Sequence, residues 1–140
     1  MAEKYYLMSK DTGNGPCLMG ELQRLGKGEY QFRYLVEGGM FPEWFMQIPG
    51  MGDISRVYST KEALYYIINR LVPEEGSWEA GVLMGQNGIA EFDEWDLLES
   101  LVAMHGQYQA GKPPLCDSHQ LFYFYPSIPD HAKRYGREAV

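Results

Sequence analysis

The chain lacks the features that mark a membrane or secreted protein. No apolar run in its 140 residues approaches the ~18–20 residues that a membrane-spanning helix needs. The amino end, residues 1–6, has no basic region followed by an apolar core, so we expect no secretory signal. Two cysteines, Cys17 and Cys116, are too few for a disulfide framework, and their spacing alone leaves a pairing between them open. These absences favour a cytoplasmic protein with no membrane segment.

Lysine and arginine are missing from one long stretch. The net charge is −7, and no lysine or arginine occurs between Leu71 and Gly111. The same stretch holds these acids: Glu74, Glu75, Glu79, Glu91, Asp93, Glu94, Asp96 and Glu99. A nucleic acid would be repelled there, so we expect no direct nucleic-acid binding. Two interpretations stay open: a solvated face with favourable charge at helix starts, or a surface for a basic partner.

The length and the apolar content predict one folded domain. An apolar share of 45% and an aromatic share of 14% are typical of a globular chain and argue against disorder. We expect a single domain over residues 1–140, with the charged segment 130–140 as a frayed tail.

Alternating apolar residues predict a small antiparallel sheet. Strands are expected over residues 5–8, 17–22, 30–36, 41–48 and 121–125. In the third strand every second residue is large and apolar: Tyr30, Phe32, Tyr34 and Val36. One face of the sheet should therefore be buried. The unbroken apolar run 121–125 is more typical of a strand buried on both faces than of an edge strand.

Helix-capping residues predict three helices. The first begins at a capping box formed by Ser59 and Glu62 and ends at Pro73. The second, weakened by internal glycines, runs from Ser77 to Gly88. The third runs from Asp93 to Gly106. We therefore expect an α+β fold: an amino-terminal meander and a carboxy-terminal strand in one small antiparallel sheet, with about three helices.

The sequence offers little chemistry for a metal site or a reaction. Cys116 and His119 form one loose pair, with His105 and His131 at a distance, whereas structural zinc usually takes two paired clusters of ligands. No serine-nucleophile elbow, cysteine-protease signature or phosphate loop is present. We expect no metal, no cofactor and no catalytic residue, and hence a protein that is not an enzyme.

Acids and tryptophans are the candidates for contact with a partner protein. Tryptophan is enriched at binding hot spots, and acids attract a basic surface. The predicted partner-binding residues are Glu91, Asp93, Glu94, Asp96, Glu99, Trp78 and Trp95. The sequence does not show which tryptophans are exposed.

The segments 20–22 (Gly-Glu-Leu) and 28–35 (Gly-Glu-Tyr-Gln-Phe-Arg-Tyr-Leu) resemble the opening of the amino-terminal subdomain of HipA-type kinases. Residues 53–59, with Leu64 and 69–73, are similar to the next block of that subdomain and of HipA-like, HIRAN-associated bacterial proteins. Fainter similarities are Asp96-Leu97-Leu98, and Cys116-Asp117-Ser118 before a strand that ends at Pro126. The resemblance covers most of residues 5–126. It implies an α+β interaction subdomain, because phosphate transfer in the family belongs to a larger carboxy-terminal part.

Three functions follow as hypotheses. The first is a non-catalytic protein–protein interaction module, a regulatory or antitoxin-like partner that restrains a HipA-type kinase, as the resemblance implies. The second is a phage or mobile-element inhibitor that directs the acidic residues 71–111 against a basic nucleic-acid-binding protein. The third is a small enzyme centred on Cys116 and His119.

Overall fold

The protein has a small α+β fold. The computed structural model describes residues 3–9, 17–36, 47–105, 115–116 and 122–128. The strands are β1 (Lys4–Met8), β2 (Leu18–Gly26), β3 (Glu29–Tyr34), β4 (Val57–Tyr58) and β5 (Tyr123–Tyr125). The helices are α1 (Thr60–Tyr66), α2 (Trp78–Asn87) and α3 (Glu94–His105), with a 3₁₀ turn, η1 (Ile68–Arg70), after α1. The expected fold class is confirmed, and the predicted tail lies outside the described residues.

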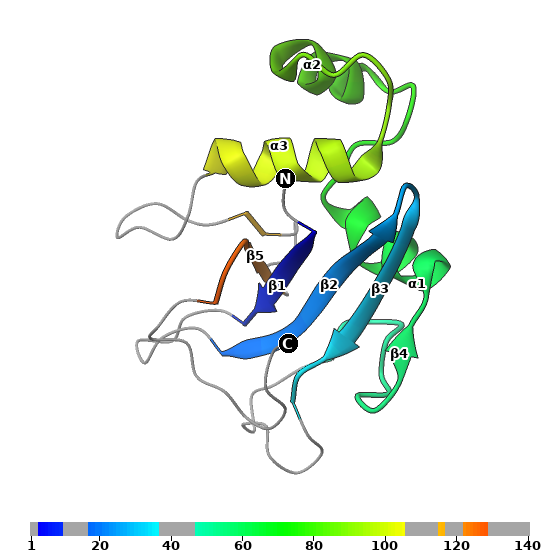
Figure 1. Ribbon diagram of the computed structural model, residues 1–140, viewed down its shortest axis with the longest axis vertical. Coiled ribbons are helices and arrows are strands. Elements are labelled where there is room, and N and C mark those ends of the chain that lie inside the picture. Colours follow the sequence, from blue (N-terminus) through cyan, green and yellow to red (C-terminus); the bar gives the residue numbers. More distant parts are fainter. Residues whose placement is uncertain (1–2, 10–16, 37–46, 106–114, 117–121, 129–140) are drawn as a thin grey trace.

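The five strands form one antiparallel sheet in the order β4-β3-β2-β1-β5 (Figure 1). β2 and β3 form a hairpin whose turn contains Gly28 at φ 72°, a conformation that glycine adopts without strain. β2 continues to Gly26, beyond the predicted end at Leu22. The reason is pairing across the hairpin, because Gln23 lies opposite Gln31 and Arg24 opposite Tyr30.

The ends of the sheet differ from the prediction. β4 has only two residues, too few for an alternating pattern, and pairs with β3 through Tyr58 and Phe32. Among the described residues β5 is the last strand of the sheet, so the expectation that it is not an edge strand was wrong. The predicted burial on both faces is confirmed, because the consecutive residues Phe124 and Tyr125 are both buried. The outer side of β5 is partly covered, since Phe124 donates a backbone hydrogen bond to Leu115 O at 2.8 Å. Most of the strand predicted over residues 41–48 lies outside the described residues.

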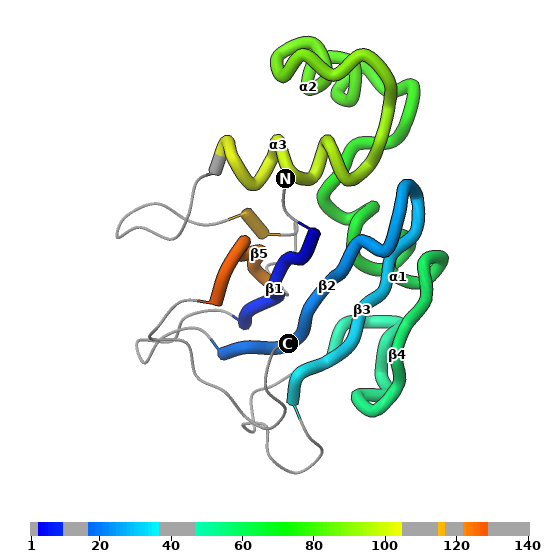
Figure 2. Tube along the Cα trace, in the orientation of Figure 1, coloured from blue at the N-terminus to red at the C-terminus, as the bar shows by residue number. Residues whose placement is uncertain are grey.

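One face of the sheet forms the core with the helices. The aromatic residues predicted to share this face are all buried: Tyr30, Phe32 and Tyr34, together with Val36 just beyond the strand. α1 and α3 pack on the same face, through Ala63 and Trp95 among others (Figure 2). The alternation read from the sequence is therefore confirmed as a buried aromatic face.

The first helix is shorter than the sequence suggested. α1 ends at Tyr66, where Ile67 leaves the helical conformation at φ −120° and ψ −67°. The chain then forms the 3₁₀ turn η1, in which Arg70 N donates a hydrogen bond to Ile67 O at 3.1 Å. The tighter turn leaves both Ile67 and Ile68 with none of their surface exposed, and this burial is the physical reason for the break.

The predicted caps of α2 and the predicted N-cap of α3 are confirmed, whereas the predicted end of α3 at Gly106 lies outside the described residues. Ser77 Oγ accepts a hydrogen bond from Ala80 N at 3.1 Å, and α2 ends at Gly88 in the left-handed conformation. Asp93 Oδ1 accepts from Trp95 N at 2.9 Å at the start of α3. In α2, Ala80 and Leu83 are buried, whereas Val82 is 37% exposed.

Candidate functional site

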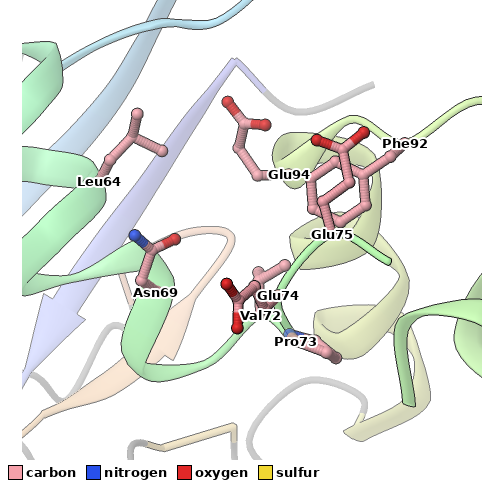
Figure 3. Close-up of a pocket in the computed structure, with 8 residues that line it drawn as sticks. All are labelled: Leu64, Asn69, Val72, Pro73, Glu74, Glu75, Phe92 and Glu94. Carbon is pink, nitrogen blue, oxygen red and sulfur yellow. The ribbon is translucent and has the colours of Figure 1, made fainter. Parts of the chain in front are cut away.

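A pocket of about 410 Å³ lies between the α1–η1 region and the start of α3 (Figure 3). We call it the η1–α3 pocket. Its lining residues are Leu64, Asn69, Val72, Pro73, Glu74, Glu75, Phe92 and Glu94. Apolar side chains and three carboxylates therefore face one volume, and that volume lies within the range usual for ligand pockets.

Local chain chemistry explains the position of the two consecutive acids. Pro73 cannot continue a helix, so the chain turns away after η1. Gly76 takes φ 83°, and Ser77 N donates to Glu74 O at 3.0 Å, which closes a tight turn before α2. Glu74 and Glu75 are consequently exposed at the rim of the pocket.

Glu94 is held in place by the core. Tyr30 OH donates a hydrogen bond to Glu94 Oε1 at 2.9 Å. Tyr30 itself is buried, and its ring stacks on Trp95 with the centroids 5.4 Å apart. Burial, reinforced by the bond to Glu94, raises the pKa of the Tyr30 phenol well above its ordinary value. The phenol stays protonated and continues to orient the Glu94 carboxylate.

The raised pKa of Tyr30 predicts a loss of stability in alkali. The unfolded phenol ionises near pH 10 while the folded one does not, so the stabilisation is complete below that pH and is lost as the pH rises. Above pH 10 the native protein should lose about 1.4 kcal/mol per pH unit from this residue. Urea denaturation at pH 8 and 11 should therefore show the stability difference between wild type and Tyr30→Phe shrinking. A constant difference would contradict the prediction.

Among the described residues, the pocket carboxylates have no cationic partner. The ion pairs among the described residues join Lys4 and Arg33 to Glu21, Arg24 to Asp93, and Arg56 to Glu62. None involves Glu74, Glu75 or Glu94. The rim of the pocket therefore carries acidic charge that no described lysine or arginine neutralises.

The structure divides the seven predicted partner-binding residues. Glu91 and Trp78 are exposed, and Trp78 has 78% of its surface accessible. Glu94 lines the pocket. Asp96 and Glu99 are partly buried on α3, and Glu99 adds to the effect of burial in raising the pKa of the Tyr5 phenol.

Two of the seven are structural, which corrects the prediction. Trp95 has no exposed surface and packs between Tyr5 and Tyr30, with ring centroids 5.1 and 5.4 Å away. Asp93 is only 8% exposed, caps α3, and lies 3.4 Å from the Arg24 guanidinium. Neither side chain is available as a surface anchor.

Sequence reasoning missed most of the pocket. Glu74 and Glu75 belong to the acidic stretch but were not among the predicted contacts, and nothing in the pattern singled out Asn69 or Phe92. The only available signal was a proline followed directly by two acids, which indicates an exposed acidic turn. That this turn lies beside α1 and α3 depends on the tertiary structure, which no local sequence pattern shows.

A second hollow of about 440 Å³ adjoins α1. It is lined by Lys61, Glu62, Leu64, Tyr65, Tyr66 and Asn69, and so shares Leu64 and Asn69 with the η1–α3 pocket. Tyr65 is exposed, and its ring packs edge-on against Tyr66 at 5.0 Å. This hollow offers aromatic surface but fewer acids.

The residues considered for metal binding or catalysis can be placed only in part. Cys116 is partly buried and lies opposite Tyr123 in an isolated β-bridge, while Cys17 is buried. His119 and His131 lie outside the described residues. Within the described ranges, no three histidine, cysteine or acidic side chains gather as a set that could hold a metal ion.

Comparison of the chain with protein-family models, curated proteins and solved structures gives no match. The resemblance to the HipA subdomain therefore stays a prediction that depends on the residues quoted for it. None of the helices in the described ranges is both long and apolar enough to span a bilayer.

Proposed function

We propose that this chain is a non-catalytic protein–protein interaction module. Its contact surface is the acidic surface, which we define by Trp78 and these acids: Glu74, Glu75, Glu79, Glu91 and Glu94. The observation that carries the proposal is the exposure of Trp78, 78% of whose surface is accessible at the first position of α2. The stretch around it contains no lysine or arginine from Leu71 to Gly111.

The exposure of Trp78 is explained by burial of its side chain in an interface with a partner protein. Its indole is the largest apolar side chain, and its burial at an interface is a frequent source of binding energy. Val82, one helical turn further along α2, is 37% exposed and lies on the same side of the helix. Trp78 and Val82 supply apolar surface, and the acids near them in the sequence supply charge, a combination that is usual at an interface.

The charge of the surface supports a basic partner. Two copies of the acidic surface would repel each other, because it carries only acids. A lysine- or arginine-rich surface would be attracted, and its association rate would fall as salt is added.

The resemblance to the HipA subdomain supports a specific role. A cytoplasmic HipA-type kinase is the partner, and the chain restrains it as a regulatory or antitoxin-like protein. The acidic surface itself favours one alternative, a phage or mobile-element inhibitor that occupies the basic groove of a nucleic-acid-binding protein. In that case neutralising Glu91, Glu94 and Glu99 together should abolish binding.

The test compares Trp78→Ala with Leu25→Ala in pull-downs from native cells. Leu25 is also an exposed apolar residue, 56% accessible, but it lies at the β2–β3 hairpin. We expect the partner to be retained by wild type and Leu25→Ala, and to bind Trp78→Ala at least about tenfold more weakly. Quantitative mass spectrometry of the retained proteins measures the difference.

The identity of the lost protein separates the two roles. A HipA-type kinase supports the regulatory role, and inhibition of that kinase by the purified chain should follow. A basic nucleic-acid-binding protein supports the inhibitor. If Trp78→Ala and wild type retain the same proteins in equal amounts, the acidic surface is not the contact surface.

A further inference from the structure

The η1–α3 pocket has the composition of a site for a long cation. Leu64, Val72 and Phe92 provide apolar surface, whereas Glu74, Glu75 and Glu94 provide negative charge (Figure 3). A flexible side chain with an apolar stem and a cationic end satisfies both, because the stem leaves water while the charge meets carboxylates.

Three features of the pocket favour a guanidinium over an ammonium. Glu94 is oriented by the bond from buried Tyr30, so that one carboxylate is held in a defined direction. Phe92 offers an aromatic ring, on which a planar guanidinium stacks better than an ammonium. Asn69 adds an amide that can accept a further N–H bond. Several acceptors around one flat cation match the donor fork of arginine.

We propose that the η1–α3 pocket binds an arginine side chain of the basic partner, with the guanidinium among Glu74, Glu75 and Glu94 and the stem against Phe92, Leu64 and Val72. This assignment depends on the proposed function for the source of the arginine. Trp78 follows three residues after Glu75 in the chain, so we expect one partner to engage both the pocket and Trp78. Arginine capture makes the acidic surface selective among basic proteins.

The experiment titrates the full chain with N-acetyl-arginine-N-methylamide and follows backbone amide shifts by NMR. We expect saturable binding with shifts confined to residues around Asn69, Glu74 and Glu94, and about tenfold weaker binding by Glu94→Gln. The amide introduced by Glu94→Gln still presents an oxygen to Tyr30, so the fold should be kept, and a thermal melt checks it. Glu29→Gln is the matched control: it removes the same charge from an exposed position outside both the pocket and the acidic surface, and it should bind as wild type does.

Further probes test whether the pocket prefers a guanidinium and whether that group comes from a protein side chain or from a free small molecule. The blocked norleucine analogue has a similar stem without charge, and the blocked lysine analogue has a different cation. If either binds as tightly as the arginine probe, the guanidinium assignment is wrong. If Glu29→Gln weakens binding as much as Glu94→Gln, the attraction is diffuse and there is no site. Agmatine binding more than tenfold tighter than the blocked arginine would assign the pocket to a free small molecule.

The failure of this inference is distinct from that of the proposed function. Trp78→Ala should bind the arginine probe as wild type does, because the pocket residues are unchanged. A partner that depends on Trp78, combined with no binding of the probe, overturns the pocket alone. Probe binding without any protein that depends on Trp78 overturns the interaction surface and leaves the pocket as a guanidinium site.

Discussion

Trp95→Ala is expected to lower the free energy of unfolding by about 3–5 kcal/mol. Trp95 has no exposed surface and lies between two aromatic rings, Tyr5 at 5.1 Å and Tyr30 at 5.4 Å. Removing the indole loses its burial and leaves a cavity in the layer where α3 meets the sheet. Urea denaturation followed by far-ultraviolet circular dichroism measures the change.

Trp78→Ala is the matched control for this prediction. The same atoms are removed from a side chain that is 78% exposed, so the change in stability should be under about 0.5 kcal/mol. If Trp95→Ala does not fold, the smaller cavity of Trp95→Phe should still give a measurable loss. Equal stabilities of the two alanine variants would show that Trp95 is not a core residue.

Gly20→Ala is expected to destabilise the protein by about 3 kcal/mol. A methyl group at Gly20 would lie 2.6 Å from Arg33 O and 2.7 Å from the Phe32 ring. Neither neighbour can move cheaply, because the pairing of Gly20 with Tyr34 fixes the backbone of β3, and Phe32 is fully buried. The midpoint temperature of thermal unfolding and the midpoint urea concentration should both be lower than in wild type.

Gly81→Ala is expected to have the opposite effect and to stabilise the protein. A methyl group at Gly81 meets nothing within 4 Å, and the residue lies inside α2. Alanine should therefore stabilise the helix by about 0.5–1 kcal/mol. A loss of stability in Gly81→Ala would contradict the open surface of α2. Unchanged stability in Gly20→Ala would contradict the close approach of β2 and β3.

Local signals accounted for much of the fold. Tyr30, Phe32 and Tyr34 alternate, so their burial on one face could be read directly from the sequence. Ser77 and Asp93 act through backbone groups two or three residues away, so their caps were predictable as well. The break of α1 at Ile67 was not, because it depends on burying Ile67 and Ile68 against elements distant in the sequence.

The candidate site was less predictable than the fold. Trp78 and Trp95 each lie in the first turn of a helix with acids nearby, and composition alone cannot tell them apart. Only packing shows that Trp95 faces the sheet and Trp78 faces solvent. Asp93 likewise forms a partly buried ion pair with Arg24, which lies far away in the sequence and is brought close only by the fold.

The amino-acid sequence by itself determined the α+β class, the helix caps and an acidic stretch without lysine or arginine, because these follow from periodicity, neighbouring backbone groups and charge. Only the tertiary structure decided which tryptophan is exposed, which acids are neutralised and where the η1–α3 pocket forms. Burial and pocket shape arise when elements separated in the chain are brought together, and no local pattern encodes that meeting.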